Sequence, residues 1–220
     1  MSDRLRLAAL ISGAGSSLAV VLDARQRGLL DLDVVEVICN KPQAPGLSLA
    51  ADHGVPTRVI SRVSAGAAGE DQAISDRLDT LSPDLILLTG YMRILGAKLV
   101  DRFAGRMINQ HPSLLPRHKG LNTHQRAIDA GDREHGASLH FVTPELDGGP
   151  LIAQVRVPML RGDTAQTLSD RLRPREQSLL LAVLPLFATR RLALGKQGVM
   201  LDGDPLNAPL TLGGPSLPEP

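Results

Sequence analysis

The segment Asp84–Thr89 is apolar at four consecutive positions and is bounded by Pro83 and Gly90. A strand without polar alternation indicates a parallel sheet whose two faces are both covered. Apolar or β-branched runs predict further strands at Arg4–Ile11, Val34–Cys39, Thr57–Ile60 and Arg106–Asn109. Helical spacing predicts intervening helices at Leu18–Arg27, Gly46–His53, Glu70–Leu81 and Leu95–Phe103. This alternation predicts the α/β class, with a single Rossmann-like open, mostly parallel sheet and helices on both faces.

The regular alternation of predicted strands and helices ends at Pro112. The predicted elements are then a loop at 112–121, a helix at Thr123–Ala130, strands at Ala137–Thr143 and Leu151–Val157, and a helix at Thr164–Arg190. Pro174 is expected to break or kink this last helix, because proline removes one backbone donor and clashes with the preceding turn. We expect residues 1–200 to form one domain and 201–220, rich in Pro and Gly, to form a poorly ordered, flexible tail.

Composition excludes several classes of protein. Lys and Arg number 24 against 23 Asp and Glu, so a large nucleic-acid footprint is disfavoured. The apolar run Leu7–Ile11 is too short for a membrane span or a signal sequence. The chain has one cysteine, Cys39, and therefore no internal disulfide, which makes a reducing cytoplasm the expected location.

Four segments carry residues that could bind a ligand or take part in catalysis. Three of them follow the ends of predicted strands, and the fourth lies in the turn between the last two predicted strands. They are Ser12–Ser17, Gly90–Leu95, Asn109–Pro116 and Asp147–Pro150. In an open parallel sheet, ligands bind at the carboxyl ends of the strands. We therefore expect these segments to converge on one site.

The first of these segments contains Gly13 and Gly15 and precedes a predicted helix. Glycines let the backbone approach an anion, and a helix N-terminus offers unpaired N–H groups, so the segment suits one phosphate. It is a poor dinucleotide site, because Leu18 replaces the third glycine and the next strand ends in Asn40-Lys41 without an acidic residue. A tight turn with a serine cap explains the same residues equally well, and both interpretations stay open.

Asn109 and His111 lie two residues apart at a strand end, so their side chains share one face. An amide can donate to a developing oxyanion, and an imidazole can donate a proton near neutral pH. Asp147 lies in a glycine-rich bend, and beside an imidazole it would raise the imidazole's pKa and hold the ring cationic. A locally satisfied histidine and a solvated turn aspartate are the competing interpretations.

Five of the six histidines lie in a short span: His111, His118, His124, His135 and His140. No metal-binding spacing is present among them and no cysteine joins them, so no metal is expected.

Two long segments, Ile108–Pro116 and His140–Pro150, resemble the folate-dependent formyltransferases. The opening segment Ile11–Leu18 and the segment Gly90–Leu95 resemble the branch of this family that acts on glycinamide ribonucleotide. The similarity extends in order from about residue 6 to residue 190. It implies transfer of a formyl group from 10-formyltetrahydrofolate, as co-substrate, to the amine of glycinamide ribonucleotide in purine biosynthesis, through a tetrahedral intermediate and without a metal.

The resemblance also implies residue roles. The catalytic residues it implies are Asn109, His111 and Asp147. The residues it implies for the ribonucleotide are Gly13, Gly15, Ser16, Ser17, Arg173 and Glu176. The residues it implies for the folate are Met92, Arg93, Ile94, Leu95, Asn109, Val142 and Thr143, with the loop up to Leu146.

Three alternative functions compete with this interpretation of the sequence. A formyltransferase acting on initiator methionyl-tRNA would need an RNA-binding domain and a basic surface. A formyltetrahydrofolate hydrolase would use the same three catalytic residues with water as acceptor. A nucleotide-binding module without catalysis would use only the segment Ser12–Ser17, the glycine loop. The expected partners are two small molecules, glycinamide ribonucleotide and 10-formyltetrahydrofolate, with no nucleic acid and no membrane. The protein is expected to be a monomer or a homodimer.

Overall fold

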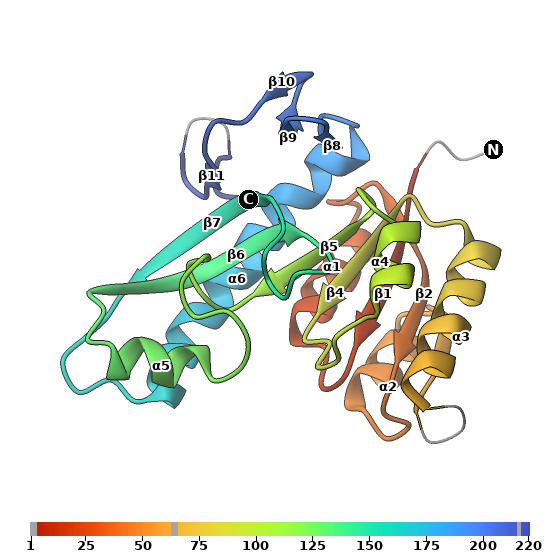
Figure 1. Ribbon diagram of the computed structural model, residues 1–220, viewed down its shortest axis with the longest axis horizontal. Helices are drawn as coiled ribbons and strands as arrows, with labels where there is room; N and C mark the ends of the chain where they lie inside the picture. Colours follow the sequence, from red (N-terminus) through yellow and green to blue (C-terminus); the bar gives the residue numbers. More distant parts are fainter. Residues whose placement is uncertain (1–3, 63–65, 215–216) are drawn as a thin grey trace.

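The computed structural model describes residues 4–62, 66–214 and 217–220. Eight strands form one sheet in the order β11-β7-β6-β5-β4-β1-β2-β3 (Figure 1). The strands from β3 to β5 are mutually parallel, and β6 runs antiparallel to both β5 and β7. The predicted fold class is thus confirmed.

The strands of this sheet are β1 (Leu5–Ile11), β2 (Leu32–Cys39), β3 (Thr57–Val59), β4 (Leu85–Thr89), β5 (Met107–His111), β6 (Glu134–Phe141), β7 (Leu151–Pro158) and β11 (Leu210–Thr211). The helices are α1 (Ser16–Gln26), α2 (Pro45–Asp52), α3 (Gly66–Leu81), α4 (Ala97–Arg102), α5 (Thr123–Asp129) and α6 (Ala165–Ala188).

The central strand β1 is buried on both faces, as its apolar sequence requires. Leu7, Ala9 and Ile11 point into a core shared with α1, α2 and α6, whereas Ala8 and Leu10 point into a core shared with α3 and α4. This alternation follows from the two-residue period of a strand. Helices therefore cover both faces of the sheet (Figure 1).

The strand order reverses at β1, which lies between β2 and β4. Ligands of open α/β sheets bind at such a switch point, beyond the carboxyl ends of the strands. The loops after β1 and β4 are joined there, since Ser12 N–H donates to the Gly90 carbonyl at 3.2 Å and Met92 N–H donates to Ser12 Oγ at 2.8 Å. β5, which ends at His111, pairs with β4 on its other side.

Pro174 was expected to break or kink the last long helix, but α6 runs through it. Thr164 caps the helix in a reciprocal capping box with Thr167, and the helix then continues through Pro174 to Ala188. An interior proline costs about 3 kcal/mol. Leu172 on one side of it and Leu179 on the other are fully buried, and each such side chain contributes about 1.5 to 3 kcal/mol. Burial on both sides of Pro174 therefore outweighs its local effect.

The segment expected to be a poorly ordered tail contains regular structure. Within it, β10 (Asp204–Pro205) joins β8 (Leu192–Gly195) and β9 (Gly198–Leu201), which precede it, in a separate three-stranded sheet seen at the top of Figure 1. β11 pairs in parallel with β7 at the edge of the main sheet, and Leu210, Leu212 and Leu217 are buried against the core. These leucines supply the apolar surface that ties the segment to the domain.

Candidate active site

The three predicted catalytic side chains meet at the end of β5. Asp147 Oδ2 lies 3.4 Å from His111 Nδ1, and Asp147 Oδ1 lies 3.5 Å from Asn109 Nδ2. The carboxylate and the imidazole are both buried, with about 9% and 7% of each side chain exposed. The structure thus brings together residues that are 38 positions apart in the chain.

The backbone around Asp147 is shaped for this contact. Asp147 has a φ of +46°, in the left-handed region. Gly149 packs so closely against β6 that a Cβ on it would lie 1.8 Å from the Phe141 carbonyl oxygen. The tight bend turns the carboxylate inward, where Gly120 N–H donates to its Oδ2 at 2.8 Å. The interpretation of Asp147 as a solvated turn residue is wrong.

The protonation of His111 differs from the sequence-based expectation. Burial lowers its pKa more than the His118 carbonyl and the Asp147 carboxylate raise it, so the net direction is downward. Burial also raises the pKa of Asp147, but His140, the Gly120 N–H and His111 outweigh burial and bring that pKa below its ordinary value. The site therefore holds a carboxylate beside an imidazole that is not cationic by default.

Both ring nitrogens of His111 nevertheless face acceptors. Nε2–H donates to the His118 carbonyl at 3.1 Å, and Nδ1 faces the Asp147 carboxylate. Only the protonated ring can donate to both. Added negative charge nearby would therefore shift His111 toward its cationic form.

His140 belongs to the site although the sequence assigned it no role. In β6 it pairs directly with Asn109 of β5. Its Nδ1–H donates to the Phe141 carbonyl at 2.8 Å, and Nε2 lies 3.1 Å from Asn109 Nδ2 and 3.7 Å from Asp147 Oδ1. His140 Nε2 thus lies within reach of both the Asn109 amide and the Asp147 carboxylate.

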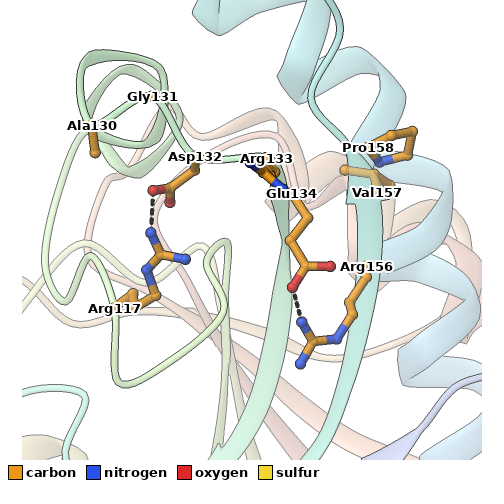
Figure 2. A pocket seen from close by; sticks show the side chains of 9 residues that line it. All are labelled: Arg117, Ala130, Gly131, Asp132, Arg133, Glu134, Arg156, Val157 and Pro158. Atoms are coloured by element: carbon orange, nitrogen blue, oxygen red, sulfur yellow. Dashed lines mark hydrogen bonds and ion pairs between the residues drawn. The ribbon is translucent and has the colours of Figure 1, made fainter.

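The loop between β5 and α5 connects the site to a second charged cluster. The His118 carbonyl oxygen accepts from His111 Nε2–H, while the His118 side chain binds Asp132 at 2.8 Å. Arg117 also pairs with Asp132. Beside this cluster lies an open hollow of about 790 Å³, in which Figure 2 shows Arg117 pointing toward Asp132 and Arg156 toward Glu134. None of the predicted site residues lines this hollow.

The glycine loop ends in a helix N-terminus without a side-chain cap. Gly15 has a φ of +70°, and Ser16 and Ser17 begin α1. A serine cap, the alternative interpretation of this segment, is absent in the described structure of α1. The first backbone N–H groups of the helix are therefore not occupied by a cap, which suits an anion.

Helix α6 passes beside the glycine loop and β5. Gln177 Nε2 donates to the Ser16 carbonyl at 3.1 Å, and Gln110 Nε2 donates to the Glu176 carbonyl at 2.7 Å. Burial raises the pKa of Glu176 to about 7, against the opposing effect of Arg173. Arg173 itself forms an exposed pair with Asp170 at 3.0 Å. The turn carrying the two predicted residues of α6 thus lies next to the predicted phosphate loop.

The residues predicted to line a folate pocket occupy different environments. Met92 and Ile94 are 61% and 66% exposed, an unusual position for large apolar side chains. Leu95 is buried in the core with α4, and Val142 packs against the same core. Thr143 Oγ1–H donates to the carbonyl of Glu145 at 3.4 Å, and Glu145 lies two residues before Asp147 in the chain.

Arg93, from the same set, is held by a buried carboxylate. Glu70 is 2% exposed, and its Oε2 accepts from Arg62 Nε at 3.0 Å and from Arg93 Nη2 at 3.5 Å. Burial raises the pKa of Glu70. The two arginines therefore converge on one acid beside the exposed segment that carries Met92 and Ile94.

Metal-ligating clusters and membrane-spanning helices would point to other classes of function. No group of three or more His, Cys, Asp or Glu side chains is arranged to hold a metal ion in residues 4–62, 66–214 and 217–220. Across the same residues, every helix is too short or too polar to cross a lipid bilayer.

Comparison with known proteins gives consistent matches. The family model described as formyl transferase matches residues 5–184. The chain is 43% identical over 202 residues to the phosphoribosylglycinamide formyltransferase of Haemophilus influenzae, covering 91% of this chain and 95% of that protein. The structure of the phosphoribosylglycinamide formyltransferase of Coxiella burnetii superposes with a TM-score of 0.90 at 40% identity, covering 94% and 99% of the two chains. A formyltetrahydrofolate deformylase from Burkholderia mallei is more distant, with a TM-score of 0.81 and 30% identity over 90% of this chain and 70% of that one.

Proposed function

This chain belongs to the formyl transferase family, and we infer from that membership that it transfers a formyl group to the amine of glycinamide ribonucleotide in purine biosynthesis. The donor is 10-formyltetrahydrofolate, and the products are the N-formylated ribonucleotide and tetrahydrofolate. The higher identity to the two phosphoribosylglycinamide formyltransferases than to the deformylase supports this acceptor over water.

The reaction begins when the neutral amine of the ribonucleotide attacks the formyl carbon. A new C–N bond forms, and the carbonyl electrons move onto the formyl oxygen. Asn109 donates to this oxyanion, and the positive charge of protonated His111 stabilises it. One oxyanion donor is worth about two to three powers of ten in turnover. The Asn109 amide nitrogen lies 3.1 Å from His140 Nε2 and 3.5 Å from Asp147 Oδ1. The N–H that points at Asp147 makes the longer contact, and this N–H donates to the substrate oxyanion.

The developing oxyanion resolves the protonation problem at His111. Burial disfavours the cation in the free enzyme, but a second negative charge next to Asp147 favours it. Asp147 then takes the proton that the amine sheds, directly or through water. Asp147 passes this proton on, directly or through water, to the folate nitrogen as the bond between that nitrogen and the formyl carbon breaks, so that charge and protons balance.

The substrates are placed by the flanking loops. The phosphate binds at Gly13, Gly15, Ser16 and Ser17, where the helix N-terminus is uncapped. Glu176 accepts from the ribose hydroxyls, and Arg173 adds positive charge nearby. The folate lies along Met92, Arg93, Ile94, Leu95, Val142 and Thr143, and it covers the apolar side chains that are exposed in the free protein.

We propose that the enzyme is cytoplasmic, needs no metal and acts as a monomer or a homodimer. Cys39 is a buried free thiol, which suits a reducing compartment. The candidate site draws its residues from one chain, so a partner subunit is not required for catalysis.

The observation that carries the proposal is the meeting of Asn109, His111 and Asp147 at the end of β5. The test supplies 10-formyltetrahydrofolate with and without glycinamide ribonucleotide and follows the deformylated folate by absorbance. We expect release only with the ribonucleotide present. Equal release in its absence would identify a hydrolase and overturn the proposal.

A matched pair of variants links the activity to the site. Asn109→Ala should lower kcat by about 10²- to 10³-fold. Asn207→Ala, at an exposed position in the C-terminal segment, should leave kcat unchanged.

A further inference from the structure

A second hollow, of about 380 Å³, opens beside the glycine loop. Ser12 and Gly13 form one wall, and the loop of residues 41–45 after β2 forms the other. The hollow lies at the carboxyl ends of β1 and β2, on the ligand-binding edge of the sheet. The sequence assigned no role to the loop that forms its second wall.

The two walls are fixed to each other. Gly46 N–H donates to the Gly13 carbonyl at 3.1 Å. A Cβ on Gly46 would lie 2.5 Å from Ile11 Cδ1 and 2.8 Å from the Gly13 oxygen, so only glycine permits this approach. The Ala44 N–H also donates to the Lys41 carbonyl at 3.2 Å and closes the turn. The hollow is therefore built by the fold and does not depend on a side-chain rotamer.

Lys41 stands at the start of this loop with its backbone held on both sides. Its N–H donates to Cys39 Sγ at 3.4 Å, and the Cys39 thiol donates to its carbonyl at 3.3 Å. Within the part of the chain that the structure describes, its ammonium group has neither an ion pair nor a hydrogen bond. The other residues that line the hollow are uncharged. A single unpaired cation thus faces a site that opens onto the glycine loop.

Gly13 leaves this site open from the other side. A Cβ on Gly13 would meet no protein atom within 4 Å, and its backbone is not in the left-handed region. The glycine is therefore not required by packing or by backbone conformation, in contrast to Gly46. Its missing side chain leaves space for a ligand.

We propose that Lys41 is a further substrate-binding residue, which pairs with the phosphate of the ribonucleotide held by the glycine loop. The inference rests on the proposed function for the identity of the phosphate monoester. At this strand end a dinucleotide site carries an acidic residue that binds a ribose hydroxyl, and a cation in that place selects phosphate. Arg173, the cation suggested by sequence, is already paired with Asp170, whereas Lys41 is free to bind.

The test measures binding of ribose 5-phosphate by calorimetry, which requires no turnover. Lys41→Met should weaken binding about tenfold, the loss expected for one charge-assisted hydrogen bond. Lys41→Arg should retain most of the affinity, and the difference between wild type and Lys41→Met should shrink at high salt. Gly13→Ala should also weaken binding while leaving the melting temperature unchanged, because its methyl group enters the hollow.

The matched control is Lys196→Met, which removes another exposed lysine, in the turn between β8 and β9. Equal affinities of Lys41→Met and Lys196→Met for ribose 5-phosphate would overturn the inference. In turnover assays Lys41→Met should raise KM for glycinamide ribonucleotide about tenfold and leave kcat and the folate KM unchanged. If the enzyme bound ribose 5-phosphate through Lys41 but formylated no ribonucleotide, the phosphate anchor would stand and the proposed function would fail.

Discussion

Asp147 Oδ2 lies 3.4 Å from His111 Nδ1, and the opposite ring nitrogen of His111 donates to the His118 carbonyl at 3.1 Å. The imidazole is therefore held between a carboxylate and a carbonyl, both of which favour the protonated ring. Burial opposes them and sets the net direction of the His111 pKa downward. The balance leaves His111 sensitive to charge that appears only during the reaction.

Replacing Asp147 by Asn should lower kcat by about 10²- to 10⁴-fold, the usual contribution of a proton-transferring group. The substitution keeps the shape of the side chain but removes the charge that raises the His111 pKa. NMR titration should therefore also show a lower midpoint for His111 in the variant than in the wild type. Asp101→Asn, at an exposed position in α4, is the control and should change neither quantity. A variant that retained full turnover would remove Asp147 from the mechanism.

Binding of the ribonucleotide should tighten as pH rises through 7. Burial raises the pKa of Glu176 to about 7, so the carboxyl is neutral below that pH and ionised above it. An ionised carboxylate accepts more strongly from ribose hydroxyls than a neutral one. Initial rates between pH 6 and 8 should show KM for the ribonucleotide falling in the wild type and flat in Glu176→Gln. A parallel fall in both would show that another group titrates.

The parallel core of the fold was predictable because its central strands, β1 and β4, carry uninterrupted apolar runs. Leu85–Thr89 has no polar alternation, and burial of all five residues in β4 is what that pattern predicts. β11 was not predictable in the same way. Leu210 and Thr211 form a two-residue strand whose partner in β7 lies more than fifty positions earlier, so only tertiary pairing defines it.

The candidate site was predictable where residues occur in extended motifs, and less so where contact depends on strand register. His140 lay within a recognised segment, but its role follows from the antiparallel pairing that places it opposite Asn109. The direction of the His111 pKa was wrong for a related reason. A carboxylate neighbour can be inferred from sequence, whereas the depth of burial that outweighs it depends on the packed structure.

The two glycines after Asp147 should respond differently to alanine. A Cβ on Gly149 would lie 1.8 Å from the Phe141 carbonyl oxygen, a backbone atom that cannot move without breaking the bond between Phe141 N–H and the Pro150 carbonyl. A Cβ on Gly148 would instead meet the end of the exposed Glu145 side chain, which can rotate away. Urea unfolding should show a loss of about 2 to 3 kcal/mol for Gly149→Ala and a much smaller loss for Gly148→Ala. Equal losses would contradict the assigned backbone contact.

The pair formed by His124 and His135 should make the protein sensitive to acid. His124 Nδ1 lies 2.8 Å from His135 Nε2, and His135 also bonds the backbone of Pro112, next to His111. Burial lowers the pKa of His135 to about 4, whereas an unfolded histidine titrates near 6.5. Between these values the unfolded chain binds more protons, so stability falls as pH decreases.

The loss attributable to His135 between pH 7 and pH 5 is about 2 kcal/mol. His135→Gln cannot acquire a charge, and urea unfolding at the two pH values should show that this part of the pH dependence disappears. His53 provides a contrast, because hydrogen bonds to Leu49 and Asp23 raise its pKa. Its stabilisation is present below the unfolded pKa and is lost as pH rises, so His53→Gln should not relieve the acid sensitivity. If His135→Gln showed the same difference between pH 7 and pH 5 as the wild type, the acid sensitivity would have to arise from other groups.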